Sequence, residues 1–189
     1  MQPVFEFDSV PALVSGRIVL RRIEPEEDLP ALFELFTDTA VAQHTDTGPF
    51  TSIDDAREVM EWIDSIFVQR RGIRWAIALR SDAKAMIGTC GYNEWRRWNH
   101  SAEIGYDLMR RFWGAGVMTE ALRSMIRFGF ERMRLNRIEA DVTVGNDASA
   151  RVLEKLGFRE EGLLRQRGYW KGEYHDLRFF GLLRGEWLA

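Results

Sequence analysis

The chain has 189 residues, and its 26 lysines and arginines nearly balance 29 aspartates and glutamates, which gives a formal net charge of −3. This length suits one compact domain and is too short for two ordinary ones. The charge balance argues against a nucleic-acid partner, which usually requires a basic excess. No apolar run approaches the roughly 20 residues that span a membrane, so no membrane partner is expected. One cysteine, and an acidic start unlike a signal peptide, predict a cytoplasmic protein.

The first half of the chain is predicted as strands and helices from its hydrophobic periodicity. Residues 1–15 are treated as an N-terminal extension, and residues 16–189 as a single domain. The predicted elements are a strand at 17–23, helices at 26–36 and 54–69, and a hairpin of strands at 75–79 and 86–92. Residues 38–52 lack periodicity and contain Gly48 and Pro49, so they are predicted to form a loop.

The second half continues this alternation after a polar loop at 93–100. The predicted elements are a strand at 102–108, a helix ending near Met133, a strand at 137–144, a helix at 146–156, and strands at 158–164 and 174–183. Asn146 is a preferred N-cap, and Gly157 suits the left-handed residue that ends a helix. Helices separate only some of the strands, so the predicted fold class is α/β, with a central twisted mixed sheet flanked by helices on both faces.

The stretch from Arg110 to Ala121 places two glycines between a strand and a helix. Backbone N–H groups and the helix dipole converge there, so a pyrophosphate can bind outside the strand end. Gly114 and Gly116 allow positive φ and a close approach of backbone to the anion. The Walker motif is absent, because no Gly-Lys-Ser/Thr is present. The dinucleotide fingerprint is partly matched, with two of its three glycines, and remains an alternative.

A third interpretation rests on Arg111-x-x-Gly114-x-Gly116, which resembles the R/Q-x-x-G-x-G/A signature of the GNAT acetyltransferases. Two further blocks strengthen the resemblance. Ala102-Glu103-Ile104-Gly105-Tyr106 precedes the loop, and residues 146–158 follow it with the sequence Asn-Asp-Ala-Ser-Ala-Arg-Val-Leu-Glu-Lys-Leu-Gly-Phe. Their order and spacing resemble the RimJ/RimL-type branch of that family over roughly residues 16–187.

The resemblance implies an acetyl-CoA-dependent N-acetyltransferase in which a primary amine attacks the thioester directly. It also implies that two strands splay, so that a backbone N–H of Leu108 or Met109 meets the thioester carbonyl. The family's matching asparagine contacts the pantetheine arm, a role that Asn146 can combine with capping. The implied cofactor-binding residues are Leu108, Met109, Arg111, Phe112, Gly114, Ala115, Gly116, Val117, Met118, Asn146 and Ser149.

Two catalytic residues are implied by the same resemblance. Glu103 lies on the strand before the loop, where carboxylates of RimJ/RimL-like enzymes act as general base; a solvated or arginine-paired carboxylate is the alternative. Ser149 matches the hydroxyl proposed to protonate the leaving sulfur, although a serine one turn after a cap can be an ordinary helix residue. Many GNAT enzymes use a tyrosine for this step, and none lies near Ser149 in the sequence.

The remaining candidate residues are two tryptophans, the single cysteine and the three histidines. Trp95 and Trp98, in the predicted polar loop, either form a substrate-binding lid over the acceptor or cap the sheet edge or a dimer contact. Cys90 lies in an apolar strand, which is typical of inert packing rather than of an acyl carrier. The three histidines have no ligand spacing, so no metal site is expected. The sequence does not decide whether the acceptor is a protein N-terminus or a small amine. It also leaves open whether the protein is a homodimer, and whether it is a non-catalytic acyl-CoA-binding module.

Overall fold

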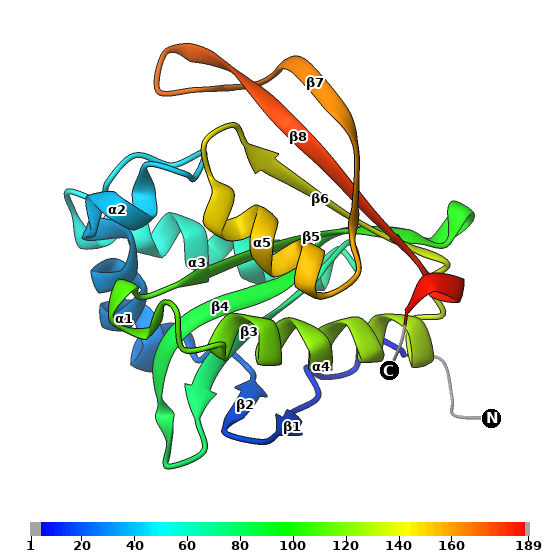
Figure 1. Ribbon diagram of the computed structural model, residues 1–189. Helices are drawn as coiled ribbons and strands as arrows, with labels where there is room; N and C mark the ends of the chain where they lie inside the picture. Colours follow the sequence, from blue (N-terminus) through cyan, green and yellow to red (C-terminus); the bar gives the residue numbers. More distant parts are fainter. Residues whose placement is uncertain (1–4, 188–189) are drawn as a thin grey trace.

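The computed structural model describes residues 5–187, in which eight strands form one twisted sheet with the order β1-β2-β3-β4-β5-β6-β8-β7 (Figure 1). The strands are β1 (Leu13–Ser15), β2 (Ile18–Arg21), β3 (Ile73–Leu79), β4 (Asp82–Arg96), β5 (Ser101–Leu108), β6 (Arg137–Thr143), β7 (Arg159–Trp170) and β8 (Glu173–Leu183). The α-helices are α1 (Pro25–Thr37), α2 (Thr39–Ala42), α3 (Ile53–Val68), α4 (Val117–Glu131) and α5 (Asp147–Lys155). Three short 3₁₀ turns complete the list: η1 (Arg97–Asn99), η2 (Arg110–Phe112) and η3 (Arg184–Glu186).

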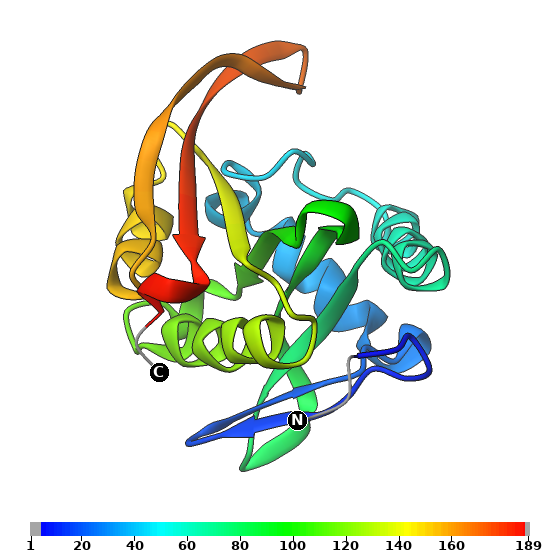
Figure 2. The ribbon, with the colours of Figure 1, turned by 90° about the vertical axis from the view of Figure 1, so that its right-hand side faces the viewer.

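The sheet is mixed, as predicted. Neighbouring strands are antiparallel except for β5 and β6, which are parallel and are joined through α4. The alternating side chains of β3 separate two hydrophobic clusters, with Ile73, Trp75 and Ile77 in one and Ala76 in the other. The first cluster packs under α4 and α5, and the second under α1 and α3, so helices cover both faces (Figure 2). The predicted fold class is confirmed.

The parallel pair opens shortly after it begins. β5 and β6 are paired at Ser101–Arg137, Ala102–Ile138 and Glu103–Glu139, whereas the pairing of β6 with β8 continues to Thr143. β5 runs on to Leu108 without β6 beside it, which is the splay that the family resemblance implies. The edge of β5 beyond Glu103 is therefore available to other groups.

Several stretches differ from the sequence prediction. β1 lies in the predicted N-terminal extension, and β4 begins at Asp82, before the predicted start of that strand. The region 93–100 is not wholly a loop, because β4 extends to Arg96 and continues to pair with β5. The predicted loop 38–52 contains the short helix α2. β7 continues to Trp170, because Gly168, Tyr169 and Trp170 pair with β8 even though the polar residues before them break the apolar alternation. The resulting β7–β8 hairpin curves away from the remainder of the sheet (Figures 1 and 2).

The described part of the predicted extension, residues 5–15, packs against the domain. Phe5 and Phe7 are buried, and their ring centroids lie 6.5 and 5.7 Å from that of Trp95. The N–H of Phe5 donates to the carbonyl of Arg132 at 2.8 Å. Two apolar side chains thus anchor this stretch to the sheet, which its sequence position alone did not predict.

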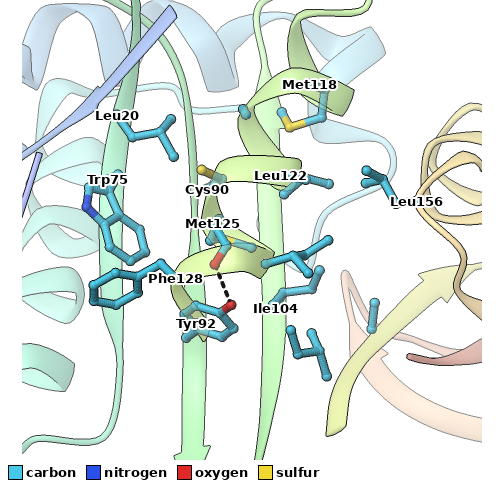
Figure 3. Close-up of a cluster of buried hydrophobic side chains, with 14 of the residues drawn as sticks. Leu20, Trp75, Cys90, Tyr92, Ile104, Met118, Leu122, Met125, Phe128 and Leu156 are labelled. Atoms are coloured by element: carbon cyan, nitrogen blue, oxygen red, sulfur yellow. Dashed lines mark hydrogen bonds between the residues drawn. The ribbon is translucent and has the colours of Figure 1, made fainter. Parts of the chain in front are cut away.

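The contact between α4 and the sheet depends on close packing at Gly129. The buried Tyr92 of β4 donates its hydroxyl to the carbonyl of Met125 at 2.8 Å, as Figure 3 shows. A Cβ atom at Gly129 would overlap that hydroxyl and would lie 3.1 Å from Leu135 Cδ1. Gly129 therefore allows α4 to approach β4 closely enough for the tyrosine to reach the helix backbone.

We expect Gly129→Ala to lower the free energy of unfolding by about 1–3 kcal/mol, because the fully buried Tyr92 cannot move aside. This loss outweighs the gain of about 1 kcal/mol that alanine normally gives a helix over glycine. Gly48→Ala is the control, since a Cβ there meets nothing within 4 Å. Denaturant unfolding of both variants measures the difference. A Gly129→Ala protein as stable as the parent would contradict this account of the interface.

Candidate functional site

The glycine loop lies between β5 and α4 and has the backbone conformation that its sequence predicts. Gly114 and Gly116 have φ angles of 73° and 76°, in the left-handed region that favours glycine. Gly116 is the residue from which α4 starts. The loop is fastened from outside, because Arg17 Nη2 donates to the carbonyl of Ala115 at 3.0 Å and Arg17 Nε contacts Glu120 at 3.1 Å. The free N–H groups at the start of α4 are thus held in one place.

A cavity of about 370 Å³ adjoins this loop, and we call it the loop groove. It lies between the end of β5, the start of α4 and one side of α5, with further walls from α2 and the residues after it. Of the residues proposed from the sequence, it is lined by Leu108, Phe112, Gly114, Gly116, Val117, Met118, Asn146 and Ser149. The groove has the size typical of small-molecule sites.

A second cavity of about 640 Å³ lies against the sheet, and we call it the sheet cleft. Its walls come from α1, α3, β5, β6, the segment after α2 and the β7–β8 hairpin. The loop groove and the sheet cleft share six lining residues, which are His44, Thr45, Tyr106, Asp107, Asn146 and Ser149. Two ligands, one in each cavity, could meet at this junction.

A hydroxyl pair lies at the junction. Tyr106 Oη and Ser149 Oγ are 2.6 Å apart, and burial raises the pKa of the Tyr106 phenol. The sequence analysis missed Tyr106 because 43 residues separate it from Ser149. The fold brings them together by placing α5 beside the opened edge of β5. Tyr106 belongs to the Ala102–Tyr106 block, so a signal was present, but nothing in that block indicates its partner.

The backbone of β5 distinguishes the two amides proposed from the sequence. The N–H of Met109 donates to the carbonyl of Ile87 at 2.9 Å and so faces β4. Because successive strand residues alternate, the N–H of Leu108 faces away from β4, towards the splay. The indole N–H of Trp113 donates to the carbonyl of Leu108 at 2.7 Å on that side. Leu108, rather than Met109, thus presents its amide to the junction.

The sequence of this chain matches a known protein family. The model of the acetyltransferase (GNAT) domain matches residues 17–159. The chain belongs to the GNAT acetyltransferase family. It is 37% identical over 175 residues to an uncharacterized N-acetyltransferase p20 of Bacillus licheniformis, covering 93% of this chain and 97% of p20. It is also 33% identical to the uncharacterized N-acetyltransferase YoaA of Bacillus subtilis, covering 92% of this chain and 97% of YoaA.

A solved structure supports the assignment. RimL, a ribosomal L7/L12 alpha-N-protein acetyltransferase in complex with coenzyme A, superposes with a TM-score of 0.81 and 26% sequence identity. The match covers 92% of this chain and 98% of the RimL chain. This GNAT enzyme therefore has a relative of the same fold that binds coenzyme A.

Other predicted cofactor contacts of this GNAT protein have different surroundings. Arg111 pairs with Glu34 of α1, and its guanidinium lies 5.2 Å from the Phe112 ring centre. Met109 is buried in the cluster under α1 and α3. Neither residue lines the loop groove. The carbonyl of Ala115 is used by Arg17, as described above. Asn146 caps α5 as predicted, because its Oδ1 accepts the Ser149 N–H at 3.2 Å.

Glu103 lies in the sheet cleft, where it is paired with an arginine. Its Oε2 is 3.3 Å from Arg96 Nη2, and 32% of its side chain is exposed. Burial raises the pKa of Glu103, and the nearby carboxylate of Asp141 adds to that effect. The arginine-paired arrangement of the alternative interpretation is therefore present. The carboxylate also lines the cleft, and its role as general base stays a prediction.

The structure places Trp95 and Trp98 away from both cavities. Trp95 lies in β4, where it packs against Phe5 and Phe7 and under the Arg97 guanidinium at 4.4 Å. Trp98 is in η1 and is 83% exposed. Neither lines the sheet cleft, whose walls include residues 44–47 from the predicted loop and Arg167 and Trp170 from the hairpin. The described positions favour the sheet-edge alternative for Trp95.

The described residues contain neither a metal-binding cluster nor a membrane-spanning helix. Within residues 5–187, no group of three or more histidine, cysteine or acidic side chains could hold a metal ion. In the same range, no helix is both long and apolar enough to cross a membrane.

Cys90 is expected to be unreactive. Its side chain is fully buried in the cluster beneath α4 and lines neither cavity, and burial raises the pKa of its thiol to about 12. A thiolate is therefore scarce at neutral pH. We expect a chromogenic disulfide reagent to detect no thiol in the folded protein and one after unfolding. Rapid labelling of the folded protein would contradict this and would restore Cys90 as a possible acyl carrier.

Proposed function

We propose that this GNAT acetyltransferase transfers an acetyl group from acetyl-CoA to a primary amine by direct attack. One observation carries the proposal: the loop groove and the sheet cleft meet at the Tyr106–Ser149 hydroxyl pair. The groove would receive acetyl-CoA and the cleft would receive the acceptor. Direct transfer requires the two substrates to be in contact, and the shared residues provide one place for that contact.

The residues of the groove suit a nucleotide thioester. Backbone amides from Gly114 to Val117, at the start of α4, would hold the diphosphate, and the glycines would leave room for it. The pantetheine amides would pair with the free edge of β5 beyond Glu103, in the manner of an added strand. Asn146 lines the groove where that arm would reach the junction.

Each chemical step has a group at the junction. The N–H of Leu108 would donate to the oxygen of the thioester carbonyl as negative charge develops on it. The Ser149 and Tyr106 hydroxyls would deliver a proton to the departing sulfur. A carboxylate of the sheet cleft would take the proton of the acceptor ammonium. Glu103 is the residue that the sequence analysis proposed for this, and Asp107 lies on the same face of β5.

For the acceptor, we propose the N-terminal α-amino group of a protein. The support is the similarity to RimL and to the [Ribosomal protein uS5]-alanine N-acetyltransferase of Escherichia coli, which is 29% identical over 107 residues. A small-molecule amine is the alternative, because one fold and one donor site serve many acceptors. The deciding experiment follows free thiol release with acetyl-CoA and a panel of peptides and small amines, and identifies products by mass spectrometry. Binding of acetyl-CoA without turnover across the panel would favour a non-catalytic module.

We expect acetyl-CoA to raise the melting temperature of the parent protein, by a stabilisation of about 2.7 kcal/mol at 100 times Kd. Gly114→Trp should abolish this shift, because a bulky ring would occupy the place of the diphosphate. Gly114→Ala is the matched control: it shares the unfavourable positive φ but adds one methyl group, which meets no neighbour within 4 Å. An unchanged shift in a folded Gly114→Trp protein, or a shift with NAD alone, would refute the donor site.

We expect Tyr106→Phe to lower kcat by about 10²-fold or more, since it removes the partner of the Ser149 hydroxyl from the proton path. Acetyl-CoA should still raise the melting temperature of this variant. Tyr169→Phe, at a tyrosine that is 64% exposed on the hairpin, makes the same chemical change outside both cavities. If the two variants have equal kcat, the hydroxyl pair plays no part in proton transfer.

A further inference from the structure

Asp107 is placed where the two cavities meet. It lines both the loop groove and the sheet cleft, and it directly precedes Leu108, whose amide faces the splay. Side chains alternate along β5, so Asp107 and Glu103 share one face of the strand, with Gly105 between them. Glu103 lines only the sheet cleft. Five residues at about 3.3 Å each place its Cα roughly 16 Å from that of Leu108.

A buried arginine holds Asp107 in one orientation. Arg74 of β3 is 6% exposed, and its Nη2 lies 3.2 Å from Asp107 Oδ2 and 2.7 Å from Thr89 Oγ1. Its Nη1 donates to Asn93 Oδ1 at 2.6 Å. A Cβ at Gly105 would lie 3.1 Å from Arg74 Nη1 and closer still to Asn93 Nδ2. The absence of a side chain at Gly105 thus makes space for the groups that fix Asp107.

Only one oxygen of Asp107 is used by this network. Arg74 and Thr89 both contact Oδ2, whereas Oδ1 has no hydrogen bond to any residue of the described range 5–187. Oδ1 is also not sealed from solvent, and the side chain is 17% exposed. This fixed carboxylate, in the lining of both cavities, therefore has one oxygen that no hydrogen bond within residues 5–187 engages. Glu103 differs, because Arg96 contacts it and also bridges Glu94 and Glu139.

Stability does not explain this arrangement. Desolvating an arginine and an aspartate is unfavourable, and apolar residues of similar volume would often stabilise a core at least as well. The pair is also incomplete for a structural device, since Arg74 Nε is buried without a partner and one Asp107 oxygen is unused. What the pair does supply is a positioned acceptor of hydrogen bonds beside the amide that would face the thioester.

We propose that Asp107 is the carboxylate that binds the acceptor ammonium and accepts its proton. This inference rests on the proposed function. Asp107 Oδ1 takes one proton from R–NH₃⁺, and the neutral amine then forms the C–N bond at the thioester carbonyl. The C–S bond breaks as the electron pair leaves on sulfur, which receives a proton through the Ser149 and Tyr106 hydroxyls, while the new amide nitrogen loses one to the same pair. Asp107 releases its proton to solvent, so the net change is one proton per turnover.

The surroundings of Asp107 agree with such a role. Burial raises the pKa of its carboxyl, the Asp46 carboxylate raises it further, and the Arg74 guanidinium opposes both effects. The net direction is upward, which brings the proton affinity of the carboxylate closer to that of an amine.

The test compares Asp107→Asn with Glu103→Gln, using the peptide or amine that the parent protein acetylates fastest. Asp107→Asn should lower kcat/KM by about 10²-fold or more, and Glu103→Gln by less than about tenfold. The acetyl-CoA thermal shift, measured on both variants, confirms that each is folded with an intact groove. Methoxyamine provides the second readout, because it is already neutral at pH 7 and needs no base. The loss in Asp107→Asn should be much smaller with methoxyamine than with an ordinary amine.

The results distinguish a base role of Asp107 from a purely structural role and from a base role of Glu103. Equal losses with methoxyamine and with an ordinary amine would show that Asp107 only shapes the site, and a large loss in Glu103→Gln with little in Asp107→Asn would assign the base to Glu103. Either result overturns the inference while the acetyltransferase function stands. Failure of the parent protein to acetylate any amine, despite binding acetyl-CoA, would refute the proposed function instead. A variant of Asp107 that does not fold is replaced by Asp107→Ser, which keeps a polar group for Arg74 and removes the base.

Discussion

The separation of β5 from β6 after Glu103 is the constraint on which the site depends. While the two strands are paired, they form a continuous sheet with no room for a ligand. Beyond that point, the edge of β5 is open, α5 lies beside it, and the two cavities come into contact through residues of β5, α5 and the segment after α2. The groups of β5 to which we assign chemical roles, from Tyr106 to Leu108, are consecutive residues on the part of the strand that β6 has left.

An open strand edge is costly, because backbone groups lose the partners that a neighbouring strand would give. The structure offsets part of this cost locally. The indole N–H of Trp113 donates to the backbone carbonyl of Leu108 on the open side of β5. β6 remains anchored on its other side by β8 through Thr143. β5 is therefore held by β4 and β6 by β8 on the two sides of the opening, so the direction of the Leu108 amide is set by strand pairing.

Local patterns predicted the parts of the site that are continuous in sequence. The glycines at 114 and 116, the helix after them and the cap at Asn146 each depend on neighbouring residues, so the amino-acid sequence was enough to predict them. Contacts between distant residues could not be predicted in this way. Tyr106 meets Ser149, and Arg74 meets Asp107, only because the strands are ordered as they are. Trp95 shows the same limitation, because its partners Phe5 and Phe7 come from a stretch that looked separable.

The two cavities also differ in how their walls are assembled. The loop groove is built largely from one continuous region, β5 to α4, with α5 close behind, which is where the family signature lies. The sheet cleft takes its walls from segments far apart in the chain, and Lys171 at the hairpin tip donates to the carbonyls of Ala42 and Thr45 at 2.6 and 3.0 Å. This contact links the hairpin to the end of α2 and to the segment after it, which forms part of the cleft wall. If the cleft takes the acceptor, as we propose, changes in the hairpin or in that segment can alter the acceptor while the groove stays the same. A shared signature would then specify the donor chemistry and leave the acceptor to the surrounding walls.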